Sequence, residues 1–233
     1  LHLSLRRQRQ MCIRDRRGRG RGFIRGGMTP NSSALTKTAQ YIEMSSSGNT
    51  IDFGDGTDES YGGAGLASAT RGVYNLGATA NSSPFSLVNT MDFVTIANTA
   101  NAINFGDLYF AIQHKSPLSN STRGIFAGGY SPAQSNNIEY ITIPTLGNSQ
   151  DFGDLNTSNG VTGQAGASNE TRALSLGGFH MTPSQTALNT IDFFSIASTG
   201  NSKDFGDLNG DIIYLGNCAS PTRAVVALSL IHI

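Results

Sequence analysis

The chain has 233 residues, of which 28 are glycine and none is tryptophan, and its 16 basic and 16 acidic residues give a formal net charge of zero. No stretch reaches the roughly 18 consecutive apolar residues that a membrane-spanning helix needs, so we expect no membrane span.

The two ends of the chain differ in character from everything between them. Residues 6–16, RRQRQMCIRDR, can be back-translated into a transposase adapter that is widely used in library preparation. Residues 228–233, LSLIHI, can be back-translated into the reverse complement of the inner part of that adapter. We therefore expect 1–16 and 228–233 to be adapter-derived and leave them out of the fold prediction. The alternative is a basic N-terminal arm that binds nucleic acid.

Leaving the ends out changes the charge and the cysteine count. Residues 17–227 carry 11 basic and 15 acidic side chains, a net charge of −4. Such a surface offers no electrostatic basis for binding nucleic acid. Cys218 remains as a single cysteine, so no intrachain disulfide is expected. The compartment stays open, with a virion or extracellular location as the preferred expectation.

One unit recurs about every 50 residues. The string DFGD stands at 52–55, 151–154 and 204–207, with NFGD at 104–107. A Thr-Arg pair recurs with its arginines 52, 49 and 51 residues apart, at Arg71, Arg123, Arg172 and Arg223. Such a period indicates a repeat architecture. We place four repeats within 17–227, at 17–69, 70–121, 122–170 and 171–221, with a fifth beginning at 222–227.

The third repeat shows the expected secondary structure. Residues 124–129 predict a strand that ends at a Gly pair, and 138–143, IEYITI, predict a second strand rich in β-branched and aromatic residues. Gly147-Asn148 supplies a turn before a short strand at 151–155, and GQAGAS before Thr171 predicts a strand of small residues. Four short strands without helical periodicity are typical of one β-propeller blade.

This order of strands resembles the kelch repeat. Gly pairs match at Gly26-Gly27, Gly128-Gly129 and Gly177-Gly178, although Leu76-Gly77 departs from the pattern, and the kelch aromatic matches Tyr41, Phe93, Tyr140 and Phe193. Phenylalanine stands where kelch repeats have tryptophan. The resemblance implies an all-β, kelch-like β-propeller of about four four-stranded blades, as part of a larger propeller. More loosely, the Asn/Ser/Thr-rich repeats resemble marine phage and metagenomic structural proteins.

Residues that recur in every repeat are expected to serve the scaffold. The recurring phenylalanines and aspartates of the DFGD strings are Phe53, Phe105, Phe152, Phe205, Asp55, Asp107, Asp154 and Asp207. We expect each aspartate to accept backbone N–H groups in a turn, and each Thr-Arg arginine to pair with such an aspartate of its own or the adjacent blade.

No catalytic constellation, metal site or cofactor site is predicted. D-F-G recurs without the other kinase motifs, and the acidic stretch 52–60 lacks the ligand spacing of a calcium loop. The histidines and the cysteine between the two ends show no ligand spacing.

The leading functional hypothesis is a non-enzymatic binding or virion-surface module that uses variable loops on a rigid scaffold. The variable stretches are 28–36, 79–88, 108–118, 130–135 and 155–165, and the candidate contact residues are Tyr130, His114 and His180. The expected partner is a glycan or a protein, with other virion proteins included. Two alternatives stay open: a propeller enzyme, galactose-oxidase-like or glycan-active, with its catalytic residues outside this chain, and an architectural spacer without a ligand.

Overall fold

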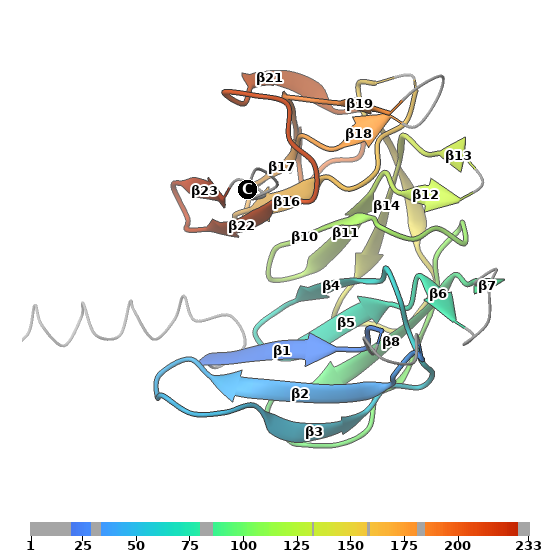
Figure 1. Ribbon diagram of the computed structural model, residues 1–233, viewed down its shortest axis with the longest axis vertical. Helices are drawn as coiled ribbons and strands as arrows, with labels where there is room; N and C mark the ends of the chain where they lie inside the picture. The colour runs from blue at the N-terminus through green and yellow to red at the C-terminus, as the bar shows by residue number, and fades with distance from the viewer. Residues whose placement is uncertain are drawn as a thin grey trace, which may run out of the picture.

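The computed structural model describes residues 20–28, 34–79, 86–131, 133–157, 159–180 and 185–227. In these residues the chain is all-β, as predicted, and consists of small antiparallel sheets (Figure 1). The adapter-like stretches 1–16 and 228–233 lie outside the described residues. In the described part, no helix is long and apolar enough to cross a membrane.

Three four-stranded sheets share one topology, in which the strands follow each other in chain order across the sheet. The second sheet along the chain consists of β4 (Ala64–Ala67), β5 (Arg71–Asn75), β8 (Thr90–Thr95) and β9 (Ile103–Asp107). The third consists of β10 (Ser116–Ser119), β11 (Arg123–Ala127), β14 (Asn137–Thr142) and β15 (Gln150–Asp154). The fourth consists of β16 (Ala165–Ser168), β17 (Arg172–Leu176), β20 (Thr190–Ser195) and β21 (Lys203–Asp207).

The first and last sheets have fewer strands among the described residues. The first contains β1 (Arg21–Arg25), β2 (Thr38–Glu43) and β3 (Ile51–Asp55), and the fifth contains β22 (Gly216–Ala219) and β23 (Ala224–Ala227). The strands β4, β10, β16 and β22, here called the inner strands, lie next to one another in that order. Each comes just before a Thr-Arg pair, so each sheet takes its inner strand from the preceding sequence repeat.

Three two-stranded hairpins connect the second and third strands of the four-stranded sheets. They are β6–β7 (Ala78–Thr79 with Ser86–Leu87), β12–β13 (Tyr130–Ser131 with Ala133–Gln134) and β18–β19 (Phe179–His180 with Thr186–Ala187). All three lie toward the right of Figure 1. We call this the hairpin end of the sheets.

The core is a series of apolar clusters between consecutive sheets rather than one central body. Phe53, Phe105 and Phe152 are each only 2 % exposed and belong to three successive clusters. Each meets the aromatic residue of the strand beside it edge to face, as Phe105 meets Phe93 at 5.9 Å between ring centroids. Phe205, in contrast, is 51 % exposed, and the fifth sheet, which follows its strand in the chain, has only two strands among the described residues.

The glycines of the first three repeated strings, Gly54, Gly106 and Gly153, allow the next sheet to approach closely. Gly54 and Gly153 have φ angles of +136° and +142°, where side chains are rare. A Cβ atom at Gly153 would lie 2.6 Å from the carbonyl of Gly200, in the turn of the following sheet. At Gly206, with a φ angle of +138°, a Cβ atom would have no neighbour within 4 Å.

The sequence-based prediction that the repeated arginines pair with the repeated aspartates was wrong for Arg71 and Arg123, whose partners are backbone carbonyls. The guanidinium of Arg71 donates to the carbonyls of Ile143 and Pro144 in the next sheet, and that of Arg123 donates to the carbonyl of Ile196. Each arginine also lies over an aromatic ring of its own sheet, as Arg123 lies 4.5 Å from the centroid of Tyr140. The arginines thus stabilise the contact between neighbouring sheets.

Two of these arginines lie near the last sheet. The guanidinium of Arg172 lies 5.3 Å from the ring centroid of Phe193 in its own sheet. Arg223 directly precedes β23, and its backbone N–H donates to the hydroxyl of Ser220.

The aspartates of the repeated string contribute through their backbone. The N–H groups of Asp55, Asp107 and Asp154 donate to the side-chain oxygens of the turn asparagines Asn101, Asn148 and Asn201 of the following sheet. Asp207 ends β21 at the same position of the fourth sheet. The expectation had these aspartates accepting N–H groups, whereas the asparagine side chain is the acceptor and the connection runs between sheets.

Candidate functional site

At the hairpin end, loops from every four-stranded sheet meet the hairpins. Short backbone bridges join the loop before each inner strand to the hairpin of its own sheet, and they pair Tyr61 with Ala78, Gln113 with Tyr130, and Thr162 with Phe179. The loops here are therefore held by regular hydrogen bonds and present side chains from a fixed base.

A buried carboxylate lies under these loops in each four-stranded sheet. Asp92, Glu139 and Asp192 occupy the same position of the third strand and are 0 %, 0 % and 7 % exposed. The pairing register shifts at each of these residues, and such a bulge redirects the side chain. Each carboxylate accepts the backbone N–H of a loop residue of the preceding sheet, namely Thr57, Tyr109 and Asn156 respectively.

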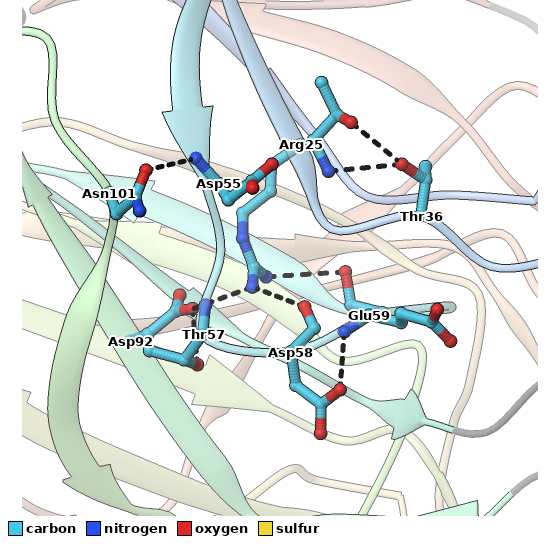
Figure 2. A network of polar contacts seen from close by, with 10 residues as sticks. Arg25, Thr36, Asp55, Thr57, Asp58, Glu59, Asp92 and Asn101 are labelled. Carbon is cyan, nitrogen blue, oxygen red and sulfur yellow. Dashed lines mark hydrogen bonds and ion pairs between the residues drawn. The ribbon is translucent and has the colours of Figure 1, made fainter.

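Two of the three carboxylates form buried ion pairs. The guanidinium of Arg25 lies 2.7 Å from Asp92 and also donates to the carbonyl of Asp58, as Figure 2 shows. The ammonium of Lys115 lies 2.9 Å from Glu139, and both side chains are 0 % exposed. Burial lowers the pKa of Arg25 and of Lys115, and the neighbouring carboxylate opposes that shift in each case. Breaking either pair would leave a charge in a dry environment.

Asp192 has hydrogen bonds but no such cation among the described residues. It accepts the hydroxyl of Ser202 at 3.0 Å and the N–H of Asn156 at 3.1 Å. The position that Lys115 occupies in the third sheet belongs to Gln164 in the fourth, because both residues directly precede an inner strand. Burial raises the pKa of the Asp192 carboxyl.

We expect Asp192→Asn to stabilise the chain at neutral pH, because burial disfavours the charged carboxylate. The raised pKa means that the folded state binds more protons than the unfolded state, so the charged carboxylate lowers the free energy of unfolding once the pH rises above about 4. The gain should shrink as the pH falls below that value. Urea unfolding at pH 7 and pH 3.5 measures it, and Asp92→Asn is the matched control, which should destabilise because Arg25 loses its partner. A loss of stability in Asp192→Asn at pH 7 comparable with the control would contradict this account.

The loop between β9 and β10 presents an exposed aromatic pair. Tyr109 is 74 % exposed and Phe110 is 44 % exposed, and their rings meet edge to face at 4.7 Å between centroids. Backbone hydrogen bonds hold the loop on both sides of the pair. On one side, the N–H of Leu108 donates to the carbonyl of Asn89, and the N–H of Tyr109 donates to the side chains of Glu139 and Ser149. On the other side, the N–H groups of Gln113 and His114 donate to the carbonyls of Tyr130 and Gly62. The aromatic pair is thus displayed by a well-anchored loop.

A second group of rings lies where the loops approach the inner strands. His114 meets Tyr61 at 5.8 Å and Tyr214 at 6.1 Å between ring centroids, and Tyr214 meets Phe179 at 5.7 Å. His114 and Tyr214 both have positive φ angles, at the position that glycine occupies in other repeats. Burial lowers the pKa of His114.

The structure places all three sequence-predicted contact residues at the hairpin end. His114 belongs to the ring group, and the backbone of Tyr130 pairs with that of Gln113 beside it. His180 follows Phe179, and its Nδ1 contacts the carbonyl of Gly160. Their side chains are half-buried rather than exposed.

The sequence-based prediction missed the more exposed pair, Tyr109 and Phe110. A signal for it was present, because the two residues after Leu108 are aromatic in this repeat only. At the same place the first repeat has Thr57 and Asp58, and the third has Asn156 and Thr157. In the part of the chain that the structure describes, no three His, Cys, Asp or Glu residues gather as they would around a metal ion.

The fold and the loops together define an all-β repeat protein with a candidate site on loops above packed sheets. No family model matches the chain, and no curated protein matches it. Solved structures do match. One described as "Structure of YjhT" has a TM-score of 0.72 and 10 % identity, over 89 % of this chain and 73 % of that chain. At this identity the likeness concerns the fold alone.

Proposed function

We propose that the chain is a kelch-like β-propeller module that binds a ligand through its hairpin end and catalyses no reaction. Support for the propeller comes from the repeated four-stranded sheets, whose strands follow outward from inner strands lying side by side. The period of about 50 residues agrees with kelch repeats. Under this proposal each four-stranded sheet is a blade, and the inner strands surround the central axis.

The observation that carries the binding function is the exposed aromatic pair on its anchored loop. Tyr109 and Phe110 offer a large contact area while the backbone beneath them is held by Glu139, Ser149 and Tyr130. Little conformational entropy is then lost when a ligand binds, because the loop is already ordered. Exposed aromatic side chains grouped in this way are typical of recognition surfaces.

The chemistry of the pair favours a glycan. The C–H face of a sugar ring packs against an aromatic ring, and its hydroxyl groups need polar partners at the edge. Ser149 lies next to the pair, and the hairpin end also carries Gln113 and Asn156. Because these donors and acceptors are neutral, they suit a ligand with hydroxyl groups better than a ligand with charged groups.

A glycan array probed with the labelled chain tests this proposal. Binding to one class of glycan is expected, and Tyr109→Ala with Phe110→Ala should weaken it at least tenfold while the melting temperature stays nearly unchanged. Leu146→Ala is the matched control, because Leu146 is 58 % exposed but lies in a turn between the third and fourth strands of its sheet. Unchanged binding in the double variant, or an equal loss in the control, would refute the site. Binding only to proteins would refute the glycan.

A further inference from the structure

The carboxylate of Asp192 lies between the third and fourth sheets, each of which has four strands among the described residues. Its Oδ2 accepts the N–H of Asn156, in the loop between β15 and β16, and the hydroxyl of Ser202. In the part of the chain that the structure describes, its Oδ1 accepts no hydrogen bond, although the residue is only 7 % exposed. One oxygen of a buried carboxylate is thus left without a partner.

In the second and third sheets, the equivalent carboxylate holds a cation. The guanidinium of Arg25 lies 2.7 Å from Asp92 (Figure 2). The ammonium of Lys115 lies 2.9 Å from Oε1 of Glu139, whose Oε2 accepts a loop N–H and a serine hydroxyl. The Oδ1 of Asp192 therefore corresponds to the oxygen of Glu139 that binds the ammonium.

The two repeat positions that supply these cations are both uncharged beside Asp192. Arg25 is the last residue of β1, and the same position at the end of β11 is Ala127. Lys115 directly precedes an inner strand, and the same position before β16 is Gln164. The Nε2 of Gln164 donates to the carbonyl of Ala127 at 3.2 Å. Gln164 is only 7 % exposed, and within the described ranges its Oε1 has no hydrogen-bond partner.

The shorter side chains leave room at this position. An aspartate side chain is one methylene shorter than glutamate, and a glutamine side chain is one atom shorter than lysine. The place that the Nζ of Lys115 fills in the third sheet therefore lies between Asp192 and Gln164 in the fourth, next to a carboxylate oxygen and an amide oxygen. The hydroxyl of Thr157, the residue after Asn156, is also buried without a hydrogen-bond partner in the described chain. Oxygen atoms of these kinds are ligands for hard cations.

The charge around Asp192 favours a cation over a neutral molecule. Asp204 is paired with Asp192 across β20 and β21 and brings a second carboxylate. The residues of the adjoining loop and hairpin that lie outside the described ranges are serine at 158 and MTPS at 181–184, and none of them is basic. Buried charges in proteins are paired with an opposite charge or coordinate a metal ion.

From these observations we propose that the carboxylate of Asp192 and the amide oxygen of Gln164 bind a small monovalent cation, namely K⁺, Na⁺ or NH₄⁺. The cation occupies the place of the Lys115 ammonium and fixes the loop between β15 and β16 to the fourth sheet. One buried carboxylate matches one positive charge, whereas sites for divalent ions gather more carboxylates. The site is separate from the aromatic pair of the hairpin end.

Thermal unfolding of the full chain at constant ionic strength tests the proposal, at a mildly alkaline pH where the carboxylate is ionised. Replacing tetramethylammonium chloride with potassium, sodium or ammonium chloride should raise the melting temperature by about 2–4 °C, and the rise should saturate, because the cation binds the folded state. The same melting temperature in all four salts would overturn the proposal and would leave the space to water.

Two variants locate the site. Gln164→Lys supplies the cation from the chain itself, so it should raise the melting temperature in tetramethylammonium chloride and abolish the response to the small cations. Asp192→Asn should abolish the response as well, and its gain in stability over the unchanged chain should shrink as potassium is added. Asp207→Asn is the matched control, because Asp207 is an exposed carboxylate of the same sheet, and it should keep the full response.

Two further outcomes would contradict the proposal. A response that persists in both Gln164→Lys and Asp192→Asn would place the cation elsewhere in the molecule. A larger rise with magnesium or calcium chloride at the same ionic strength would show that the site selects a divalent ion.

Discussion

Gly153→Ala is expected to destabilise the chain clearly more than Gly206→Ala, although both glycines stand in the same string with nearly the same φ angle, +142° and +138°. Each alanine costs about 1–3 kcal/mol for the strained backbone. Only at Gly153 would the new Cβ atom collide with the carbonyl of Gly200 in the next sheet, and overpacking of this kind adds about 1–3 kcal/mol.

Urea unfolding of the two variants separates backbone strain from the contact between sheets. The difference between the two losses measures how much the close approach of neighbouring sheets contributes to stability. If the two variants lose the same stability, the glycine is needed for its φ angle alone, and the sheets tolerate a larger separation than the structure has.

Lys115→Met is expected to cost about 3–5 kcal/mol, because it leaves the carboxylate of Glu139 buried without its cation. The double variant Lys115→Met with Glu139→Gln should recover at least half of that loss, since the glutamine oxygen still accepts the N–H of Tyr109.

Lys37→Met is the control for a cation at the surface. Lys37 lies 3.7 Å from Asp55, with side chains 55 % and 43 % exposed, and such a pair contributes at most about 1 kcal/mol. Chemical unfolding at several pH values measures all three variants. A loss in Lys115→Met no larger than that in Lys37→Met would show that water reaches Glu139.

The buried ion pair between Lys115 and Glu139 also supports the proposed binding surface. Glu139 accepts the backbone N–H of Tyr109, so the pair with Lys115 holds the loop that displays the aromatic side chains. We therefore expect the side chains of Tyr109 and Phe110 to be better ordered than is usual for exposed aromatics. The scaffold and the candidate site share one polar network.

The sequence predicted the loops that form part of the candidate site, whereas the other features of the site depend on contacts between sheets. The repeat frame located the variable loops that carry His114 and Tyr130, because loops vary where strands do not. It did not predict the partner of Arg71, which is the carbonyl of Ile143 in the next sheet. A carbonyl carries no residue-specific signal, whereas the aspartates of DFGD attracted the prediction because they are charged and recur.

What the sequence determined by itself was the local structure. Alternating β-branched and aromatic residues, Gly pairs and the period near 50 residues predicted the strands at 138–143 and 151–155, which the structure has as Asn137–Thr142 and Gln150–Asp154. Only the tertiary structure decided which residues meet between sheets. Arg25 forms an ion pair with Asp92, and Leu66 packs on Gly124, because the separation and angle of neighbouring sheets bring these residues together. Strand propensity acts over a few residues, but burial and charge pairing depend on which sheet lies alongside.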